Sequence, residues 1–366
     1  MRRSGGVAAC AALACLAILA ACEHAQPFGG FAGEPNGPRN AALPTQLTFD
    51  SLPDGDAAWM PDGSRMIYAF DPYKADHDRC LATLPPFGGH QTEIICHVPP
   101  GAFDAESTNV LSNPAGGADD RIAYLRESSP VGSVLPGSRE LVVATLAAPD
   151  PGRVVLAFPH LAPDGQLYAT VSNLHWVNDT ELVFLAELTT YPGGNGVAFD
   201  TVLTPIEVAR LVLTGDSGVV VPVPGTLGAT SATASSSGAI YYTMANDSTV
   251  YAADPAGGAG APVFVFDTLG PVTAVQVAGS RWLLVLACCQ VIARRAGQLY
   301  LGDVTTDSVR AVTTWPYVYY QRPALDPSGS YVIAEQHPVT MVGHGEGGPV
   351  DTLVSKNADL WLIRAH

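Results

Sequence analysis

The chain has 366 residues, of which 14% are charged and 47% hydrophobic, with 37 glycines and 30 prolines. It is too apolar to be disordered and too rich in turn-forming residues to be a helical bundle, so we predict a protein of many short strands. The formal net charge of −16 argues against nucleic-acid partners, because phosphate binding depends on clustered Lys and Arg.

The first 21 residues have the pattern of a secretory signal peptide. Arg2 and Arg3 precede an apolar run at 7–19, which is shorter than the roughly 20 residues that span a bilayer. The run ends in Leu19-Ala20-Ala21-Cys22, which resembles the bacterial lipobox of Leu, two small residues and Cys. The resemblance implies that residues 1–21 are removed and that Cys22 is lipidated. The alternative is an ordinary signal peptide that happens to contain a Cys.

The residues after the lipobox predict where the protein resides. By resemblance to Gram-negative sorting, Glu23 in place of Asp favours the outer membrane. Residues 22–45 are then the lipidated Cys and a tether rich in Gly, Pro and Asn, and 46–366 are one folded domain. We therefore expect a monomer held in the bacterial cell envelope by lipid on Cys22. Without Arg2 and Arg3 the mature chain has 16 basic and 34 acidic side chains, a net charge of −18.

A polar turn followed by a run of β-branched and aromatic residues recurs along the folded part. The first copy is WMPDGSRMIYAF at 59–70, and further copies lie at 119–127, 178–186, 236–244, 279–287 and 326–335. Gly, Asn or Asp supplies the turn, and the apolar run suits a buried, pleated surface. The spacing of roughly 45 to 60 residues matches one blade of a β-propeller.

The flanking residues complete the expected blades. In chain order we predict strands at 56–60, 65–70, 79–84, 92–98, 107–111, 121–127, 139–146, 153–158, 167–177, 181–188, 207–214, 219–225, 229–235, 239–244, 249–254, 262–268, 272–278, 281–287, 298–304, 308–315, 318–326, 331–337 and 358–365. The sixth unit has only three strands. QLTFDSL at 46–52 supplies the fourth, because a ring closed by its N-terminal strand leaves no open edge. The prediction is an all-β, six-bladed β-propeller of four-stranded antiparallel blades.

The PDGSRMIYAF pattern resembles the PD40 repeat of TolB-like, WD40-like β-propellers, in which a Trp-Ser-Pro-Asp-Gly turn joins the first two strands of a blade. The match is close at 59–70 and partial at 325–333, whereas LAPDGQLYAT at 161–170 carries the tripeptide one strand out of phase. TolB itself is a soluble periplasmic protein with a separate domain before its propeller. The lipobox and the missing domain mean that its role in the Tol system does not carry over.

Four cysteines belong to the folded part. Cys80 and Cys96 lie in the runs CLATL and TEIIC on either side of the turn-like PPFGGH, so a hairpin places them opposite one another, and we predict a disulfide. Cys288 and Cys289 are adjacent and face opposite sides of a strand. Two separate thiols are expected there, with a vicinal disulfide as the alternative.

The connections between the second and third strands are long, at 71–78, 128–138, 189–205, 289–297 and 338–357. In a propeller these connections emerge on one face, around the mouth of the central channel, and long loops on a rigid scaffold often bind ligands. The candidate contacts are Tyr73, Lys74, His77, Tyr191, Arg294, Arg295, His344 and Glu346. The alternative is that the loops are tolerated insertions.

Motifs that resemble catalytic sites have simpler explanations. GDSG at 215–218 lies between Val-rich runs and predicts a hairpin turn, and the glycine-rich 343–348 lacks the helix and Lys of a phosphate cradle. Asp76, His77 and Asp78 form a short acidic cluster that we expect to be a solvated loop. We therefore expect no catalytic residue, no metal and no cofactor.

The expected function is that of a non-enzymatic, outer-membrane-anchored propeller that binds an envelope protein or glycan. The first alternative is a metal-assisted polysaccharide lyase, because some PD40-like propellers use metal-bound His; here His77, His337 and His344 would have to converge. The second alternative is a structural lipoprotein without a specific ligand.

Overall fold

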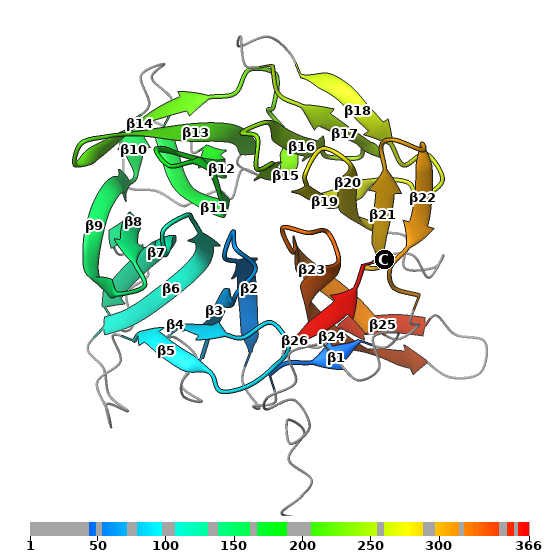
Figure 1. The fold of residues 1–366 in the computed structure, drawn as a ribbon, viewed down its shortest axis with the longest axis horizontal. Helices are drawn as coiled ribbons and strands as arrows, with labels where there is room; N and C mark the ends of the chain where they lie inside the picture. Colours follow the sequence, from blue (N-terminus) through cyan, green and yellow to red (C-terminus); the bar gives the residue numbers. More distant parts are fainter. Residues whose placement is uncertain are drawn as a thin grey trace, which may run out of the picture.

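The computed structural model describes residues 44–48, 53–71, 79–96, 107–130, 138–161, 167–188, 206–254, 260–287, 297–314, 318–343, 350–354 and 358–365. These residues form six antiparallel sheets arranged as blades around a central axis (Figure 1). Within them every regular element is a strand, and no helix is long and apolar enough to cross a membrane. The predicted six-bladed, all-β propeller is confirmed.

Each of the first five blades contains four consecutive strands, and blade 3 has one further short strand. Blade 1 contains β2 (Asp54–Trp59), β3 (Met66–Phe70), β4 (Cys80–Leu84) and β5 (Thr92–Ile95). Blade 2 contains β6 (Ser107–Gly116), β7 (Arg121–Pro130), β8 (Ser138–Thr145) and β9 (Ala148–Phe158). Blade 3 contains β10 (His160–Leu161), β11 (Leu167–Asn178), β12 (Glu181–Leu188), β13 (Ile206–Thr214) and β14 (Ser217–Pro222). Blade 4 contains β15 (Ala229–Ala234), β16 (Ile240–Met244), β17 (Thr249–Ala252) and β18 (Ala261–Val265). Blade 5 contains β19 (Val272–Ala278), β20 (Trp282–Ala287), β21 (Leu299–Asp303) and β22 (Ser308–Ala311).

Blade 6 closes the ring with a strand from the N-terminal side. Its order is β23 (Val318–Leu325), β24 (Tyr331–Gly343), β26 (Asp359–Arg364) and β1 (Thr45–Gln46). The closing strand was expected at 46–52, but regular pairing covers only β1, and single hydrogen bonds continue it through Leu47 and Thr48 to Leu360, at 2.7 and 2.9 Å. Its position is set by the register with β26, and residues 49–52 lie outside the described part of the chain.

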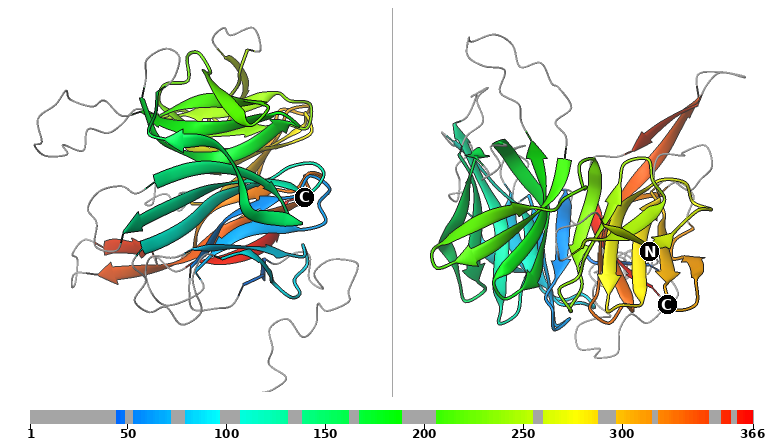
Figure 2. Two further views of the ribbon diagram at one scale, coloured as in Figure 1. Left: turned by 90° about the vertical axis from the view of Figure 1, so that its left-hand side faces the viewer. Right: turned by 90° about the horizontal axis from the view of Figure 1, so that it is seen from above.

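The segment 338–357 is not a simple loop, which corrects the expectation. The second half of β24 pairs with β25 (Val350–Val354), from Val339 opposite Val354 to Gly343 opposite Val350. This hairpin projects from the body of the propeller (Figure 2, right). The two strands of this hairpin satisfy one another's backbone hydrogen bonds, so the hairpin can extend beyond the blade.

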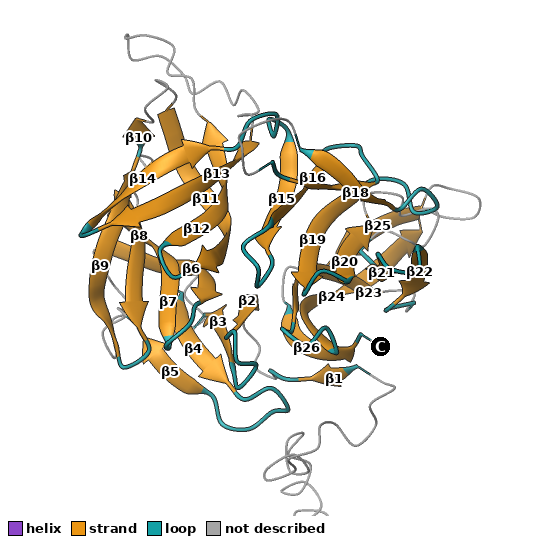
Figure 3. Ribbon diagram, turned by 45° about the horizontal axis from the view of Figure 1, so that its top comes forward, coloured by secondary structure: helices purple, strands orange, loops and turns teal. Residues whose placement is uncertain are grey.

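The second strand of each blade is apolar because neighbouring blades cover both of its faces. All five residues of β3 are buried, and Val183, Phe184 and Leu185 of β12 are buried in succession. Alternate residues then serve different cores, since Val183 packs toward blade 4 and Phe184 toward blade 2. Figure 3 shows the blades packed face to face.

Two tryptophans at the same position of different blades link neighbouring blades. Trp59 at the end of β2 donates its indole N–H to the carbonyl oxygen of Ala324 in blade 6, at 3.0 Å. Trp176 in β11 donates to the carbonyl oxygen of Ala115 in blade 2, at 3.3 Å. The Trp of the PD40-like turn therefore satisfies a polar group of the preceding blade as well as filling the core.

Blade 1 carries the disulfide between Cys80 at the start of β4 and Cys96 just after β5, with Cα atoms 4.6 Å apart. The antiparallel register places Leu81 opposite Ile95, which brings the two cysteines together. Cys288 and Cys289 lie outside the described residues.

Candidate functional site

The innermost strand of every blade has a bulge or register irregularity, which lies at the start of the strand in blades 4 and 5. The irregularities lie between residues 55 and 58, 112 and 115, 172 and 175, 229 and 231, 272 and 274, and 321 and 324. Four residues there have left-handed backbone angles, with φ of 54° at Asp56, 48° at Asn113, 55° at Asn173 and 43° at Arg322. Asp and Asn tolerate this conformation better than other non-glycine residues, and a bulge redirects its side chain.

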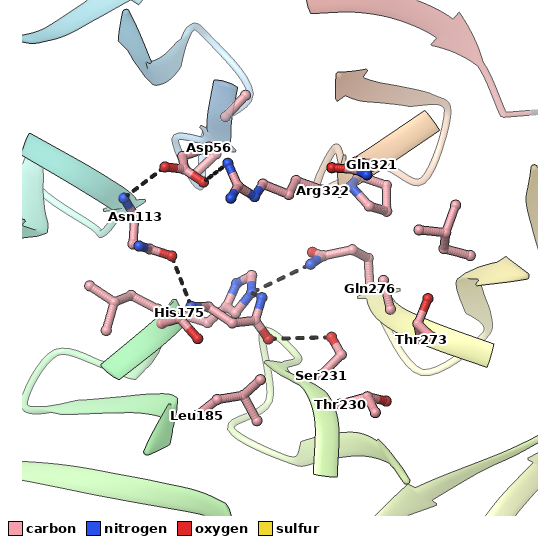
Figure 4. Close-up of a pocket in the computed structure, with 18 of the residues that line it drawn as sticks. Asp56, Asn113, His175, Leu185, Thr230, Ser231, Thr273, Gln276, Gln321 and Arg322 are labelled. Atoms are coloured by element: carbon pink, nitrogen blue, oxygen red, sulfur yellow. Dashed lines mark hydrogen bonds and ion pairs between the residues drawn. The ribbon is translucent and has the colours of Figure 1, made fainter. Parts of the chain in front are cut away.

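The bulge side chains connect one blade to the next around the channel (Figure 4). In each case a side-chain oxygen accepts a hydrogen bond from a backbone N–H of the following blade. The pairs are Asp56 Oδ2 with Asn113 N at 3.4 Å, Asn113 Oδ1 with Asn173 N at 3.1 Å, Asn173 Oδ1 with Ala232 N at 2.7 Å, and Ser231 Oγ with Val275 N at 3.1 Å. The chain of hydrogen bonds ends in blade 5, because the Val275 side chain has no acceptor atom.

The junction between blades 6 and 1 uses charged groups instead. Arg322 occupies the bulge position of blade 6 and cannot accept a hydrogen bond, so Glu335 from β24 accepts the N–H of Asp56, at 2.8 Å. Arg322 Nη1 lies 2.8 Å from Asp56 Oδ1 and 3.2 Å from Glu335 Oε1. Arg79 reaches Asp56 Oδ2 at 3.2 Å from the other side. Arg79 also pairs with Asp71, at 3.1 Å, so three carboxylates and two guanidinium groups form one network of ion pairs.

Glu335 remains ionised in this cluster although it is only 4% exposed. Burial acts to raise the pKa of the Glu335 carboxyl, but the hydrogen bond with His337 and the Arg322 charge outweigh it and lower the pKa below its ordinary value. Burial likewise acts to lower the pKa of Arg322, and the charges of Asp56 and Glu335 raise it overall. Both pKa shifts favour the charged forms, so Glu335 and Arg322 form an ion pair at neutral pH.

A cavity of about 450 Å³ lies in the channel among the inner strands. Leu185 near the end of β12 and Leu286 near the end of β20 line it, as does Tyr319 near the start of β23. In an antiparallel blade the start of the first strand and the end of the second lie at the same edge. The cavity therefore lies toward the end of the channel where the long second-to-third connections leave the blades.

A second cavity of about 350 Å³ follows toward the other end of the channel, where Trp59 and Trp176 lie. His175 and Gln276 line both cavities and face one another with their Nε2 atoms 3.4 Å apart (Figure 4). These two side chains mark the boundary between the two halves of the channel.

His175 is neutral at physiological pH, because burial lowers its pKa to about 4. Its Nε2 lies 3.3 Å from Asn173 Nδ2 and 3.4 Å from Gln276 Nε2, so it is assigned as the acceptor of these amides. His175 was not identified from the sequence, because the histidine has no motif around it in the chain. The feature that could have identified it is its position in β11, two residues after the bulge residue Asn173.

The structure does not place the contacts predicted from sequence. Tyr73, Lys74, His77, Tyr191, Arg294, Arg295, His344 and Glu346, together with Cys22, lie outside the described residues. GDSG at 215–218 forms the hairpin between β13 and β14, as expected; Gly215 and Asp216 make the turn, with a φ of 59° at Gly215, and Ser217 and Gly218 begin β14. Of the three histidines in the lyase alternative, only His337 is described, and it contacts Glu335 at 3.4 Å. Among the described residues no group of three His, Cys, Asp or Glu could hold a metal ion.

Neither a protein-family model nor a curated protein matches the sequence, whereas many solved structures do. A gluconolactonase from Xanthomonas campestris is 13% identical with a TM-score of 0.51, over 89% of this chain and 90% of that one. U3-55K is 12% identical with a TM-score of 0.50, over 88% and 99% of the two chains. TolB from Acinetobacter baumannii is 14% identical with a TM-score of 0.49, over 84% of this chain and 65% of TolB, so the match spans less than two thirds of TolB.

At such identities the similarities establish the fold alone, and the similar proteins act in different ways. They include TolB and a gluconolactonase. The chain is a six-bladed β-propeller.

Proposed function

We propose that this protein is a lipid-anchored propeller of the bacterial cell envelope that binds an envelope protein or glycan and is not an enzyme. The observation that supports binding most directly is the 450 Å³ cavity at the end of the channel where the long connections leave the blades. Cavities of about 300 to 1,000 Å³ with a few fixed polar groups are typical of binding sites.

The ionisable groups around the cavity favour binding over catalysis. Asp56 and Glu335 are held by arginines, and the Nε2 of His175 already faces two amide groups. A general base needs a free lone pair and a pKa near the working pH. These three described side chains are therefore better suited to shaping a site than to moving protons.

The anchoring part of the proposal depends on the lipobox and on domain limits of 1–21, 22–45 and 46–366. Replacement Cys22→Ser is expected to abolish labelling with radioactive palmitate and to shift the protein out of the outer-membrane fraction. The unchanged protein is expected to be labelled and to sediment with that fraction. Unlabelled wild-type protein would overturn the anchoring.

The binding part is tested by affinity capture of the Cys22-anchored protein from its native envelope. A variant with 340–353 replaced by Gly and Ser is expected to lose the captured partner, because this segment forms part of the projecting hairpin of β24 and β25. The matched control replaces the hairpin turn 215–218 on blade 3, which should retain it. Partner retention by the 340–353 variant, or no partner for the wild type, would contradict the proposal.

A further inference from the structure

We infer that the 450 Å³ cavity binds an uncharged saccharide of about two sugar units. The inference rests on the proposed function, which assigns binding to this end of the channel. It goes further because it names the class of ligand. It is carried by the charge balance, the hydrogen-bonding groups and the size of the cavity.

The charged groups of the cavity are mutually compensated. Asp56 and Arg322 are the charged side chains among the residues that line the cavity, and they pair with one another at 2.8 Å. Behind them, Glu335 pairs with Arg322 at 3.2 Å, and Arg79 is shared between Asp56 at 3.2 Å and Asp71 at 3.1 Å. An anionic ligand would compete with Asp56 for Arg322, and a cationic ligand would compete with Arg322 for the carboxylates. The Asp56 side chain is only 6% exposed, so separating it from Arg322 would leave a buried charge uncompensated, and the cavity therefore selects against both kinds of ligand.

The remaining polar groups match hydroxyl groups. A sugar hydroxyl both donates and accepts a hydrogen bond, as do an amide side chain and a Thr hydroxyl. Gln276 is only 9% exposed, yet its amide reaches the cavity beside neutral His175. Thr273 and Gln321 add a hydroxyl and a second amide to the lining.

Arg322 can take part without leaving its carboxylates. Its Nη1 bridges Asp56 and Glu335, while 55% of its side chain is exposed to the channel. A guanidinium has five N–H donors, so further donors are available to a hydroxyl group. The ion-paired Arg322 therefore acts as a fixed hydrogen-bond donor of the site.

The cavity also has an aromatic wall that suits the apolar face of a sugar ring. Tyr319 lines it, and its ring also packs so closely on Gly297 that a Cβ added to Gly297 would lie 2.3 Å from the ring. The positive φ of 68° at Gly297 and this contact both require glycine. Tyr319 is thus held in place before any ligand binds, which reduces the entropy lost on binding.

The test is isothermal titration of the detergent-solubilised mature lipoprotein with maltose, lactose and N,N′-diacetylchitobiose. The charged disaccharides for comparison are digalacturonate, which is anionic, and deacetylated chitobiose, which is cationic. At least one neutral disaccharide is expected to bind with a dissociation constant below about 1 mM. Both charged disaccharides are expected to bind at least about tenfold more weakly than that sugar. The same sugars coupled to a carrier protein distinguish a free saccharide from the end of a longer glycan, and binding in either form supports the inference.

Gln276→Leu keeps the approximate size of the side chain and removes the amide, so it is expected to weaken binding about tenfold or more. Gln91→Leu makes the same chemical change at an exposed position in blade 1 and should bind as the wild type. Thr273→Val is a second pocket variant if Gln276→Leu does not fold, as judged by circular dichroism.

The inference is overturned if no neutral disaccharide binds at about 10 mM, if a charged sugar binds more tightly, or if the pocket variants bind normally. Failure of the proposed function is distinguishable from these outcomes. It would show as lost lipidation or lost partner capture, whereas saccharide titration requires neither result.

Discussion

Asp56 in the inner strand of blade 1 and Arg322 in the inner strand of blade 6 form an ion pair of 2.8 Å across the junction of the two blades. The Asp56 side chain is 6% exposed and also contacts Arg79. This carboxylate therefore joins the blade that begins the ring to the blade that completes it, together with the hydrogen bonds that Glu335 and Ala324 accept from blade 1.

Replacement Asp56→Ala is expected to lower the free energy of unfolding by about 2 to 4 kcal/mol, because it leaves Arg322 and Arg79 without a shared partner. Denaturant titration followed by tryptophan fluorescence measures this change. Asp216→Ala, at a fully exposed hairpin tip, is the matched control and should change stability by less than about 0.5 kcal/mol. Equal effects of the two changes would show that the junction does not depend on Asp56.

The tryptophan links make a second prediction. Trp59→Phe removes the N–H that Ala324 O accepts and should destabilise the protein by about 1 to 3 kcal/mol. Trp176→Phe should have a smaller effect, because Trp176 is less buried and its hydrogen bond to Ala115 O is longer. Thermal unfolding of both variants tests the order, and the reverse order would contradict it.

The disulfide in blade 1 is expected to form in the exported protein. Replacing Cys80 and Cys96 together by Ser should lower the free energy of unfolding by about 3 kcal/mol, as expected for a separation of 16 residues. Peptide mass mapping after alkylation in denaturant without reductant checks the pairing. Cys80 and Cys96 should stay unmodified, whereas Cys288 and Cys289 should be alkylated as two free thiols. Alkylated Cys80 would exclude the bridge.

His175 should make stability depend on pH. Its pKa falls from 6.5 to about 4 in the folded state, so the unfolded chain binds more protons between these values. Its contribution, up to about 3 kcal/mol, is complete above pH 6.5 and is lost as the pH falls toward 4. His175→Gln should flatten this slope in unfolding measured from pH 7 to 4.5. The matched control is the surface change His90→Gln, and an unaltered slope in His175→Gln would refute the assignment.

Much of the blade pattern was predictable because it depends on local residues. The turn at 61–64 and the five buried residues of β3 are adjacent in the chain, and the same arrangement recurs at β12 and β20. Turn chemistry and apolar runs act over a few residues, so their spacing indicated the number of blades.

The ends of the ring were less predictable. The closing strand pairs with β26 from Thr45 and continues by single hydrogen bonds to Thr48, and β24 continues to Gly343 to pair with β25. Both features depend on register with a partner strand far away in the sequence, and a strand pattern alone does not determine that register.

By itself the sequence determined the strand and turn repeat, the number of blades and the resemblance to TolB-like propellers. Only the tertiary structure decided the site in the channel. Asp56, Asn113 and Asn173 are separated by 57 and 60 residues, and they meet because each occupies the bulge of an inner strand. Closure of the ring also places Arg322 beside Asp56. It brings His175 next to Gln276, although 101 residues separate these two in the chain. Such contacts arise from the geometry of the closed ring and have no local pattern in the chain.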